Sequence, residues 1–379
     1  MVEVTRKIQM VDLQSQYQKI KPDIDKAIQE VLDSAAFIAG KPIQDFAGEL
    51  AAYAGVKHVI PCANGTDALQ IAMMALDIQP GDEVITPSFT YFATVEVIAL
   101  LKAVPVFVDV NPKTFTIDAD EIEKAISPKT KAIVPVHLYG QCANMEAILA
   151  LAAKHNIPVI EDNAQAIGGS YTFSSGKKMK TGAMALMSTT SFFPSKNLGC
   201  YGDGGAMFTN DDALALKLKM VANHGQRVKY YHDLVGCNSR LDTLQAAILR
   251  VKLQHLDEYC DARRAVADYY DKAFANHPKI TTPYLAPYAH HVYHQYTMIL
   301  SDDVDRAQLI EKLKERGIPT MLYYPLACHK QKAFEKGARI FGDLKNTEWL
   351  SPRVLSLPIH TEMDEEQLKF ISDSVLGLI

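Results

Sequence analysis

Residues 190–205 read TSFFPSKNLGCYGDGG, and the lysine at position 196 is the most informative residue of the chain. It lies between an apolar segment that carries hydroxyl groups and a glycine-rich turn. Such a setting gives a lysine a fixed stem and a partly desolvated amine, which an imine-forming nucleophile requires. An ordinary surface loop can also carry a lysine among glycines, so Lys196 needs support from elsewhere in the chain.

That support is a carboxylate upstream of Lys196. Residues 157–166 read IPVIEDNAQA, an apolar strand pattern that places Asp162 at its C-terminal end. A strand-end carboxylate followed by a lysine loop is the arrangement expected for a pyridoxal phosphate site, because the carboxylate keeps the pyridine nitrogen protonated. The alternative is that Asp162 caps the helix that follows.

Composition excludes several classes of protein. With 379 residues and 48% apolar composition, the chain is long enough for two domains. A net charge of −5 and a pI near 6.2 argue against a nucleic-acid partner. Six scattered cysteines without a C-x-x-C pair argue against a zinc cluster and a disulfide framework. The N-terminus lacks an apolar signal core and the longest apolar stretch carries charges, so we expect a cytoplasmic protein without a membrane span or a metal.

From about residue 56 to 225, short Val- and Ile-rich runs alternate with helical patterns. Strands are expected at 56–62, 83–87, 105–110, 131–137 and 157–162, with helices between them at 66–76, 91–102, 120–126 and 144–156. This alternation predicts an α/β fold with a mostly parallel sheet covered by helices on both faces. Ligands of such sheets lie beyond the carboxyl ends of the strands, where Asp162 and the turn 64–66 are expected.

After residue 225 the pattern changes. A long helix is expected from 241 to 274, then a strand at 293–300, a helix at 306–316 and a strand at 319–324. We therefore predict an N-terminal helical segment (1–45) that packs on the small domain, a large cofactor-binding domain (46–260) and a smaller α+β C-terminal domain (261–379).

Five further residues are candidates for cofactor contacts, each with a plainer alternative. Gly65 and Thr66 begin a helix and would offer N–H groups and a hydroxyl to a phosphate, or form an ordinary helix start. Ser191 would reach the same phosphate, or be a half-buried strand serine. Tyr91 would stack on the ring, or be a core aromatic. Gln165 would meet the ring oxygen, or lie on a helix surface.

Several sequence blocks in this order resemble the DegT/DnrJ/StrS family of sugar-nucleotide aminotransferases. They are FIAG (37–40), ANGTDAL (63–69), GDEVITP (81–87), YGQ (139–141), ED (161–162), the Lys196 run and NSRLD (238–242). The resemblance implies the fold type I, aspartate aminotransferase-like class of pyridoxal phosphate enzymes. It also implies that Lys196 binds the cofactor covalently and moves the proton, and that Asp162 pairs with the ring nitrogen.

The same resemblance implies the remaining roles. Gln165 meets the ring oxygen, Tyr91 stacks, and Gly65, Thr66 and Ser191 hold the phosphate. Asn238 reaches the phosphate of a neighbouring subunit, so a homodimer with shared active sites is expected. Residues assigned to the sugar substrate are Arg240, Tyr323, Tyr324 and His329.

Within the family, the blocks CANGTDALQI (62–71), YGQCA (139–143), GCYGDGG (199–205) and 238–249 are most similar to the branch that aminates C3 of UDP-2-acetamido-2-deoxy-3-oxo-glucuronate for bacterial surface polysaccharide (O-antigen). Arg240 is the candidate for the sugar carboxylate, with a structural ion pair to Asp242 or a neighbour as the alternative. Where that branch has His-Tyr-Pro, this chain has a phenol at Tyr323. L-Glutamate is the expected amino donor and 2-oxoglutarate its product.

Three other functions remain open from the sequence: amination at C4 or of a dTDP- or GDP-linked sugar, dehydration on the same fold, and a regulatory protein that binds the cofactor or the nucleotide sugar without turnover. Lys196 argues against the dehydratases, which have histidine at this position.

Overall fold

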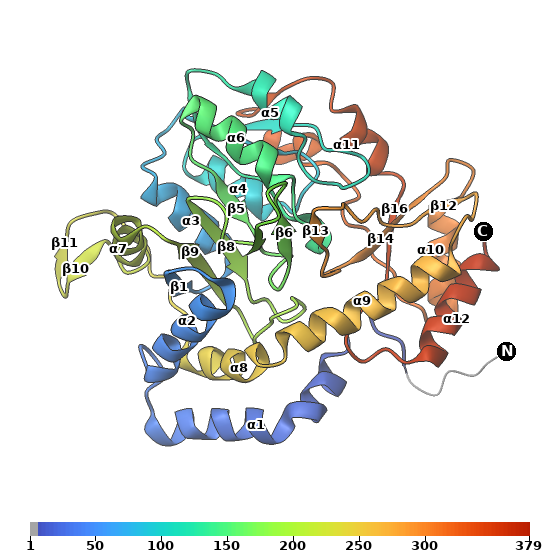
Figure 1. Cartoon of the computed structure of the whole chain (residues 1–379), viewed down its shortest axis with the longest axis horizontal. Coiled ribbons are helices and arrows are strands. Elements are labelled where there is room, and N and C mark those ends of the chain that lie inside the picture. Colours follow the sequence, from blue (N-terminus) through green and yellow to red (C-terminus); the bar gives the residue numbers. More distant parts are fainter. Residues whose placement is uncertain (1–6) are drawn as a thin grey trace.

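The computed structural model describes residues 7–379 and is built around a sheet in two four-stranded parts (Figure 1). One part has the order β1 (His58–Cys62), β9 (Gly205–Thr209), β8 (Met187–Ser191) and β5 (Ile160–Asp162). The other has the order β15 (Arg339–Ile340), β3 (Val104–Val108), β2 (Glu83–Pro87) and β4 (Thr130–Ile133). Parallel bridges from Ile133 to Val159 and from Val136 to Asp162 join the two parts.

Strand β9 runs antiparallel to both of its neighbours, and every other pairing within these two parts is parallel. The predicted mostly parallel mixed sheet is therefore confirmed.

Helices cover both faces of this sheet. Successive residues of a strand point to opposite faces, and here both faces carry apolar side chains that need to be buried. In β2, Val84 packs in a cluster with Leu69 and Val97, whereas Ile85 packs in another cluster with Ile122 and Ile148. The covering helices are α2 (Lys41–Ala54), α3 (Gly65–Ala75), α4 (Ala93–Leu100), α5 (Ala119–Ala125), α6 (Met145–His155) and α7 (Asp212–Val221).

The single helix expected over 241–274 is wrong: the structure has α8 (Thr243–Leu253) and α9 (Leu256–Ala273). His255 leaves the helical region with ψ near 2°, and α9 starts a new direction (Figure 1). Leu249 of α8 and Leu256 of α9 pack in the core of the large sheet on either side of the break. From there α9 carries Ala267 and Tyr270 into a second core.

The second core lies between α9 and an antiparallel sheet of β12 (Ile280–Thr281), β14 (Tyr296–Leu300) and β16 (Val354–Leu357). Helices α10 (Arg306–Glu315) and α12 (Glu365–Leu376) complete it. The strand expected at 319–324 does not form; Met321 alone bridges Ser356, and the chain then turns toward the large sheet.

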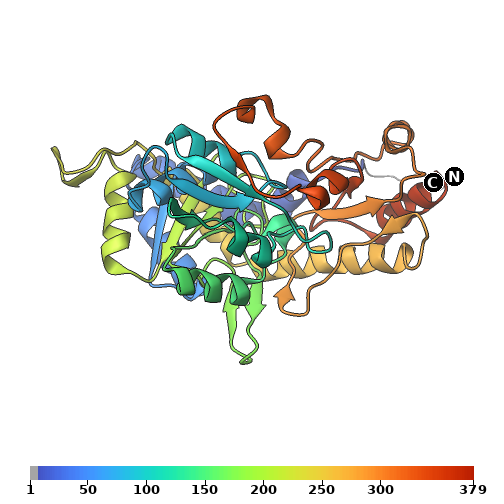
Figure 2. The same cartoon turned by 90° about the horizontal axis from the view of Figure 1, so that it is seen from above.

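Smaller elements complete residues 7–379. A hairpin of β6 (Ser170–Thr172) and β7 (Lys178–Lys180) pairs with β13 (Ala289–His290) and projects from the body in Figure 2. The others are β10 (Gln226–Val228), β11 (Tyr231–His232), α11 (Lys345–Leu350) and the short helices η1 (Leu138–Gly140), η2 (Cys328–Lys330) and η3 (Lys332–Phe334). Over this range, no helix combines the length and apolar character needed to cross a bilayer.

Helix α1 (Leu13–Ser34) contacts both α8 and the segment just before α12. Ile20 and Ile24 pack against Ile248 of α8, while Lys19 forms an ion pair of 2.6 Å with Glu362 near the C-terminal helix. The division into segments 1–45, 46–260 and 261–379 stays a prediction, as does the packing partner assigned to the first.

Candidate active site

A cavity of about 640 Å³ lies beyond the carboxyl ends of β5 and β8, beside the start of α3. Nine of the residues selected from the sequence line it: Gly65, Thr66, Tyr91, Asp162, Gln165, Ser191, Lys196, Tyr323 and Tyr324. They come from parts of the chain more than 250 residues apart. The fold therefore brings most of the predicted site into one space.

One end of the cavity suits a phosphate. Asn64 caps α3 by accepting the N–H of Asp67 at 2.8 Å, and the hydroxyls of Thr66 and Ser191 line the same end. A Cβ built on Gly65 would lie 2.7 Å from Cβ of Ser191, so only glycine fits here. The N–H groups at a helix start and the positive end of the helix dipole favour an anion.

Asp162 presents a buried carboxylate to the cavity. Thr94 Oγ1 donates a hydrogen bond of 2.8 Å to Oδ2, and the N–H of Ala164 donates one of 3.1 Å to Oδ1. Burial raises the pKa of Asp162 above its ordinary value, while these two bonds and the charge of Lys196 oppose the shift. A cationic ring nitrogen in the cavity would stabilise the ionised carboxylate further.

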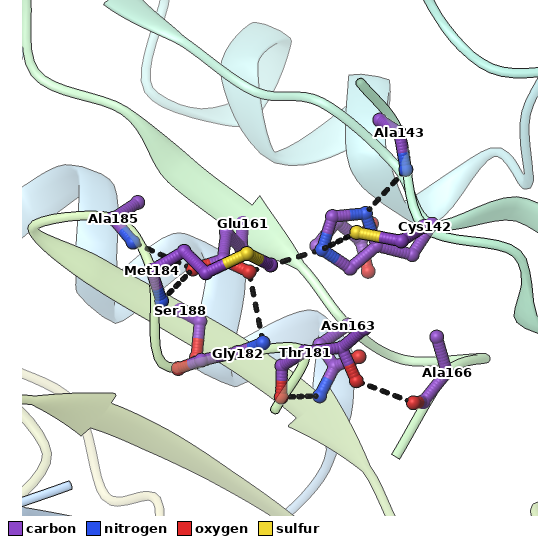
Figure 3. Close-up of polar contacts among 12 residues, drawn as sticks. Cys142, Ala143, Glu161, Asn163, Ala166, Thr181, Gly182, Met184, Ala185 and Ser188 are labelled. Atoms are coloured by element: carbon purple, nitrogen blue, oxygen red, sulfur yellow. Dashed lines mark hydrogen bonds and ion pairs between the residues drawn. The ribbon is translucent and has the colours of Figure 1, made fainter. Parts of the chain in front are cut away.

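Behind Asp162, the fully buried Glu161 anchors the strand end (Figure 3). Its carboxylate accepts the N–H groups of Gly182, Met184 and Ala185 at 2.7–2.8 Å. His137 Nε2 lies 3.0 Å from the same carboxylate, and its Nδ1 accepts the N–H of Ala143 at 3.2 Å, which places the ring hydrogen on Nε2. The main-chain N–H of His137 also bonds the carbonyl of Asp162 at 3.0 Å.

Lys196 follows β8 on a tight turn. Its N–H bonds the carbonyl of Phe193 at 2.8 Å, and a Cβ on Gly199 would lie 2.3 Å from the carbonyl oxygen of Pro194. Burial lowers the pKa of the Lys196 amine to about 8, against the attraction of Asp162. A much larger neutral fraction is then present near pH 7.5 than for an exposed lysine, as a nucleophile requires.

Gln165 is held in a defined orientation. Its Oε1 accepts the N–H of Tyr139 at 2.7 Å, so Nε2 points the other way and donates to the hydroxyl of Tyr324 at 3.1 Å. The amide therefore offers a donor to the cavity. Tyr91 lies at the mouth, 58% exposed, with its ring centroid 6.1 Å from that of Tyr324.

Several lining residues were missed from the sequence, among them Thr94, His294 and Gln295. His294 is buried, and burial together with the charge of Lys196 holds its pKa well below the ordinary value, so the ring is neutral. Gln295 Nε2 lies 3.4 Å from His294 Nε2. These two residues belong to the C-terminal part of the chain and follow no motif spacing, so only the folded structure shows that they line the cavity.

Three predicted residues lie outside this cavity. Asn238 and Arg240 are exposed beside the β10–β11 hairpin, which projects from the body in Figure 1. Among residues 7–379, Arg240 has no ion-pair partner, so the alternative pair with Asp242 does not form. His329 bonds Ser88 at 2.7 Å and Glu348 at 3.2 Å through its two ring nitrogens, and this placement gives no support to substrate binding.

The cavity fits pyridoxal phosphate. The start of α3 favours an anion, Asp162 presents a buried carboxylate, and the pKa of Lys196 is lowered. The family model of the DegT/DnrJ/EryC1/StrS aminotransferases matches residues 18–376. The chain is 47% identical over 366 residues, covering 96% of it and 98% of the relative, to a UDP-2-acetamido-2-deoxy-3-oxo-D-glucuronate aminotransferase of Pseudomonas aeruginosa. It is 46% identical over 370 residues, 97% of each protein, to a "pleiotropic regulatory protein" of Geobacillus stearothermophilus.

Solved structures agree with these relatives. NtdA from Bacillus subtilis, solved with the bound cofactor PMP, superposes with a TM-score of 0.89 at 33% identity, covering 100% of this chain and 86% of NtdA. The chain therefore belongs to the DegT/DnrJ/EryC1/StrS aminotransferase family, and it is a pyridoxal phosphate-dependent sugar-nucleotide transaminase.

Proposed function

We propose that this enzyme moves the amino group of L-glutamate onto C3 of UDP-2-acetamido-2-deoxy-3-oxo-glucuronate, for a bacterial surface polysaccharide. The observation that carries the proposal is the 47% identity, over nearly the whole of both chains, to a transaminase named for that substrate. The sequence blocks around Gly65, Gly140 and Asn238 support the same branch of the family.

The cofactor supplies an aldehyde that takes the amino group and a ring that accepts electrons when a proton leaves the substrate carbon. Gly65, Thr66 and Ser191 would hold its phosphate, Asp162 would pair with its ring nitrogen and Gln165 would meet its ring oxygen. Lys196 Nζ takes the proton from the α-carbon of glutamate, and it returns a proton to the sugar carbon in the second half-reaction. The larger neutral fraction that the lowered pKa of Lys196 gives suits the first of these steps.

The sugar end of the cavity is formed by Tyr323 and Tyr324. Both phenols remain neutral because burial raises the pKa of each above its ordinary value, so they act as hydrogen-bond donors to sugar oxygens. Arg240 is proposed to bind the sugar carboxylate. Its exposure and lack of an ion pair within the described chain leave its guanidinium available.

We further propose a cytoplasmic homodimer in which Asn238 and Arg240 of one subunit complete the site of the other. The β10–β11 hairpin and the residues after it expose large apolar side chains next to these two residues, including Tyr230 at 76% and Val235 at 86%. Exposed apolar surface of this kind is typical of a protein interface.

A mixed dimer of one Lys196→Ala subunit and one Asn238→Ala subunit tests the shared site. One of its two sites combines the intact Lys196 of one subunit with the intact Asn238 of the other, so the mixed dimer is expected to regain one functional site, which neither parent has.

The experiment that tests the function starts with glutamate alone. The protein, loaded with cofactor, is expected to release 2-oxoglutarate in a single turnover. A panel of UDP-, dTDP- and GDP-linked keto-sugars then follows, with mass analysis of each product. Amination of the UDP-linked 3-keto-uronate at the highest kcat/KM supports the proposal, and a preference for a C4 ketone or another nucleotide contradicts it.

A further inference from the structure

Tyr139 connects three segments that surround the cavity. Its N–H donates to Gln165 Oε1 at 2.7 Å, its carbonyl accepts the N–H of Gln295 at 3.3 Å, and its phenol donates to the carbonyl of Tyr323. Each of these partners lines the cavity, whereas Tyr139 itself is buried behind them. Every polar group of Tyr139 is therefore used to place a cavity residue.

The backbone of Tyr139 has an unusual conformation for a bulky residue, with φ at +59°. This left-handed region is unfavourable for residues with a Cβ, and it persists where the surroundings hold it. Gly140 follows with φ at +101°, and a Cβ there would lie 2.9 Å from the main-chain nitrogens of Tyr293 and His294. The Tyr139 ring packs edge-on to Phe115 at 5.2 Å between centroids.

The segment held by the phenol is 321–326, which we call the substrate segment. At one end, Met321 exchanges two main-chain hydrogen bonds of 3.1 and 2.9 Å with Ser356. Beyond the other end, the N–H of Cys328 bonds the carbonyl of Ser88 at 3.0 Å. The Tyr139 phenol donates to the segment between these two anchors, at the carbonyl of Tyr323, and the Tyr323 side chain is part of the cavity lining.

A side-chain contact continues the connection. The Tyr324 hydroxyl accepts a hydrogen bond of 3.1 Å from Gln165 Nε2. Tyr139 thus orients Tyr323 directly and Tyr324 through Gln165. A small displacement at Tyr139 would move both phenols together.

We propose that Tyr139 is a positioning residue for the keto-sugar: its phenol holds the substrate segment so that Tyr323 and Tyr324 meet the sugar. This inference rests on the proposed function for its substrate. Glutamate is small and reacts at the depth of Lys196 and Asp162, whereas a nucleotide sugar must extend past the substrate segment, whose ends Met321 and Leu326 are 44% and 41% exposed. Loss of the Tyr139 phenol should therefore weaken binding of the keto-sugar and leave the reaction with glutamate unchanged.

The test is Tyr139→Phe, which removes one hydroxyl and keeps both the aromatic ring and the N–H that bonds Gln165. We expect the KM for the keto-sugar to rise about five- to tenfold, the effect of one buried hydrogen bond, with kcat and the single-turnover rate with glutamate unchanged. Independently of turnover, hydrogen exchange in peptides that cover 321–326 is expected to accelerate about fivefold in the cofactor-free protein.

The matched control is Tyr270→Phe, because Tyr270 is also buried and its hydroxyl also donates to a main-chain carbonyl, that of Pro358 at 3.0 Å, and neither residue is part of the cavity lining. It is expected to change neither sugar KM nor exchange at 321–326. Equal losses for glutamate and sugar in Tyr139→Phe, or unchanged exchange in the substrate segment, would overturn the proposal. Absence of 2-oxoglutarate release by the unmodified protein would instead refute the proposed function, and the exchange result would still report on the role of Tyr139.

Discussion

The hydroxyl of Thr94 lies 2.8 Å from Oδ2 of Asp162, so a residue at the start of α4 sets the electrostatics of a carboxylate at the end of β5. This bond stabilises the ionised form of Asp162 against the burial that raises its pKa. Without the hydrogen bond from Thr94, a smaller fraction of Asp162 would be ionised at a given pH.

Thr94→Val removes this bond with little change of volume. The pKa of Asp162 should rise further, so the acid limb of kcat/KM should move to higher pH and the rate at the optimum should fall about tenfold, as for one charge-assisted hydrogen bond. Thr116→Val is the control, since Thr116 is a buried threonine whose hydroxyl bonds Thr114. An acid limb that stays in place in Thr94→Val would show that Thr94 does not tune Asp162.

The lowered pKa of Lys196 predicts how the cofactor-free protein captures pyridoxal phosphate. Since only the neutral amine attacks, the capture rate should rise with pH and reach half of its maximum near pH 8. Borohydride trapping followed by peptide mapping measures it. Lys252 provides an internal control, because burial also lowers its pKa to about 8 but it lies outside the cavity lining. Label on Lys252 in place of Lys196 would contradict the assignment.

Gly65→Ala should weaken cofactor binding. The added methyl would lie 2.7 Å from Cβ of Ser191, so the start of α3 must move away from the phosphate position. We expect the dissociation constant for pyridoxal phosphate, measured by absorbance titration, to rise at least about tenfold, because more than one N–H contact is displaced. Gly48→Ala in α2 is the control: an added Cβ there meets no atom within 4 Å, and cofactor affinity should not change.

Glu161→Gln should destabilise the protein without touching the cavity. The carboxylate accepts three main-chain N–H groups and the His137 ring, and an amide nitrogen in its place would face at least one of these donors. The expected loss in the free energy of unfolding, measured with denaturant, is about 2–4 kcal/mol. Glu146→Gln, at an exposed carboxylate that accepts from Ser174, should have little effect. Equal stability of the two variants would contradict the anchoring role of Glu161.

Much of the fold follows from local pattern. Strand β2 has the predicted bounds, and α3, α5 and α6 begin and end within about one residue of the expected ones. The break between α8 and α9 was missed, because both halves have helical periodicity. Only the packing shows that α9 changes direction at His255 and so extends from the first core into the second.

Local pattern is enough to find the strands up to Asp162, the carboxylate at the end of the last of them and the lysine loop around Lys196. Strand β8, which pairs with β5 and brings Lys196 beside Asp162, is seen only in the folded chain. The folded chain alone shows that Thr94 and His294 line the cavity with this pair, that Tyr139 lies behind Gln165, and that His329 lies outside. These contacts join segments far apart in the chain, and their geometry depends on how the two cores pack, which no local pattern encodes.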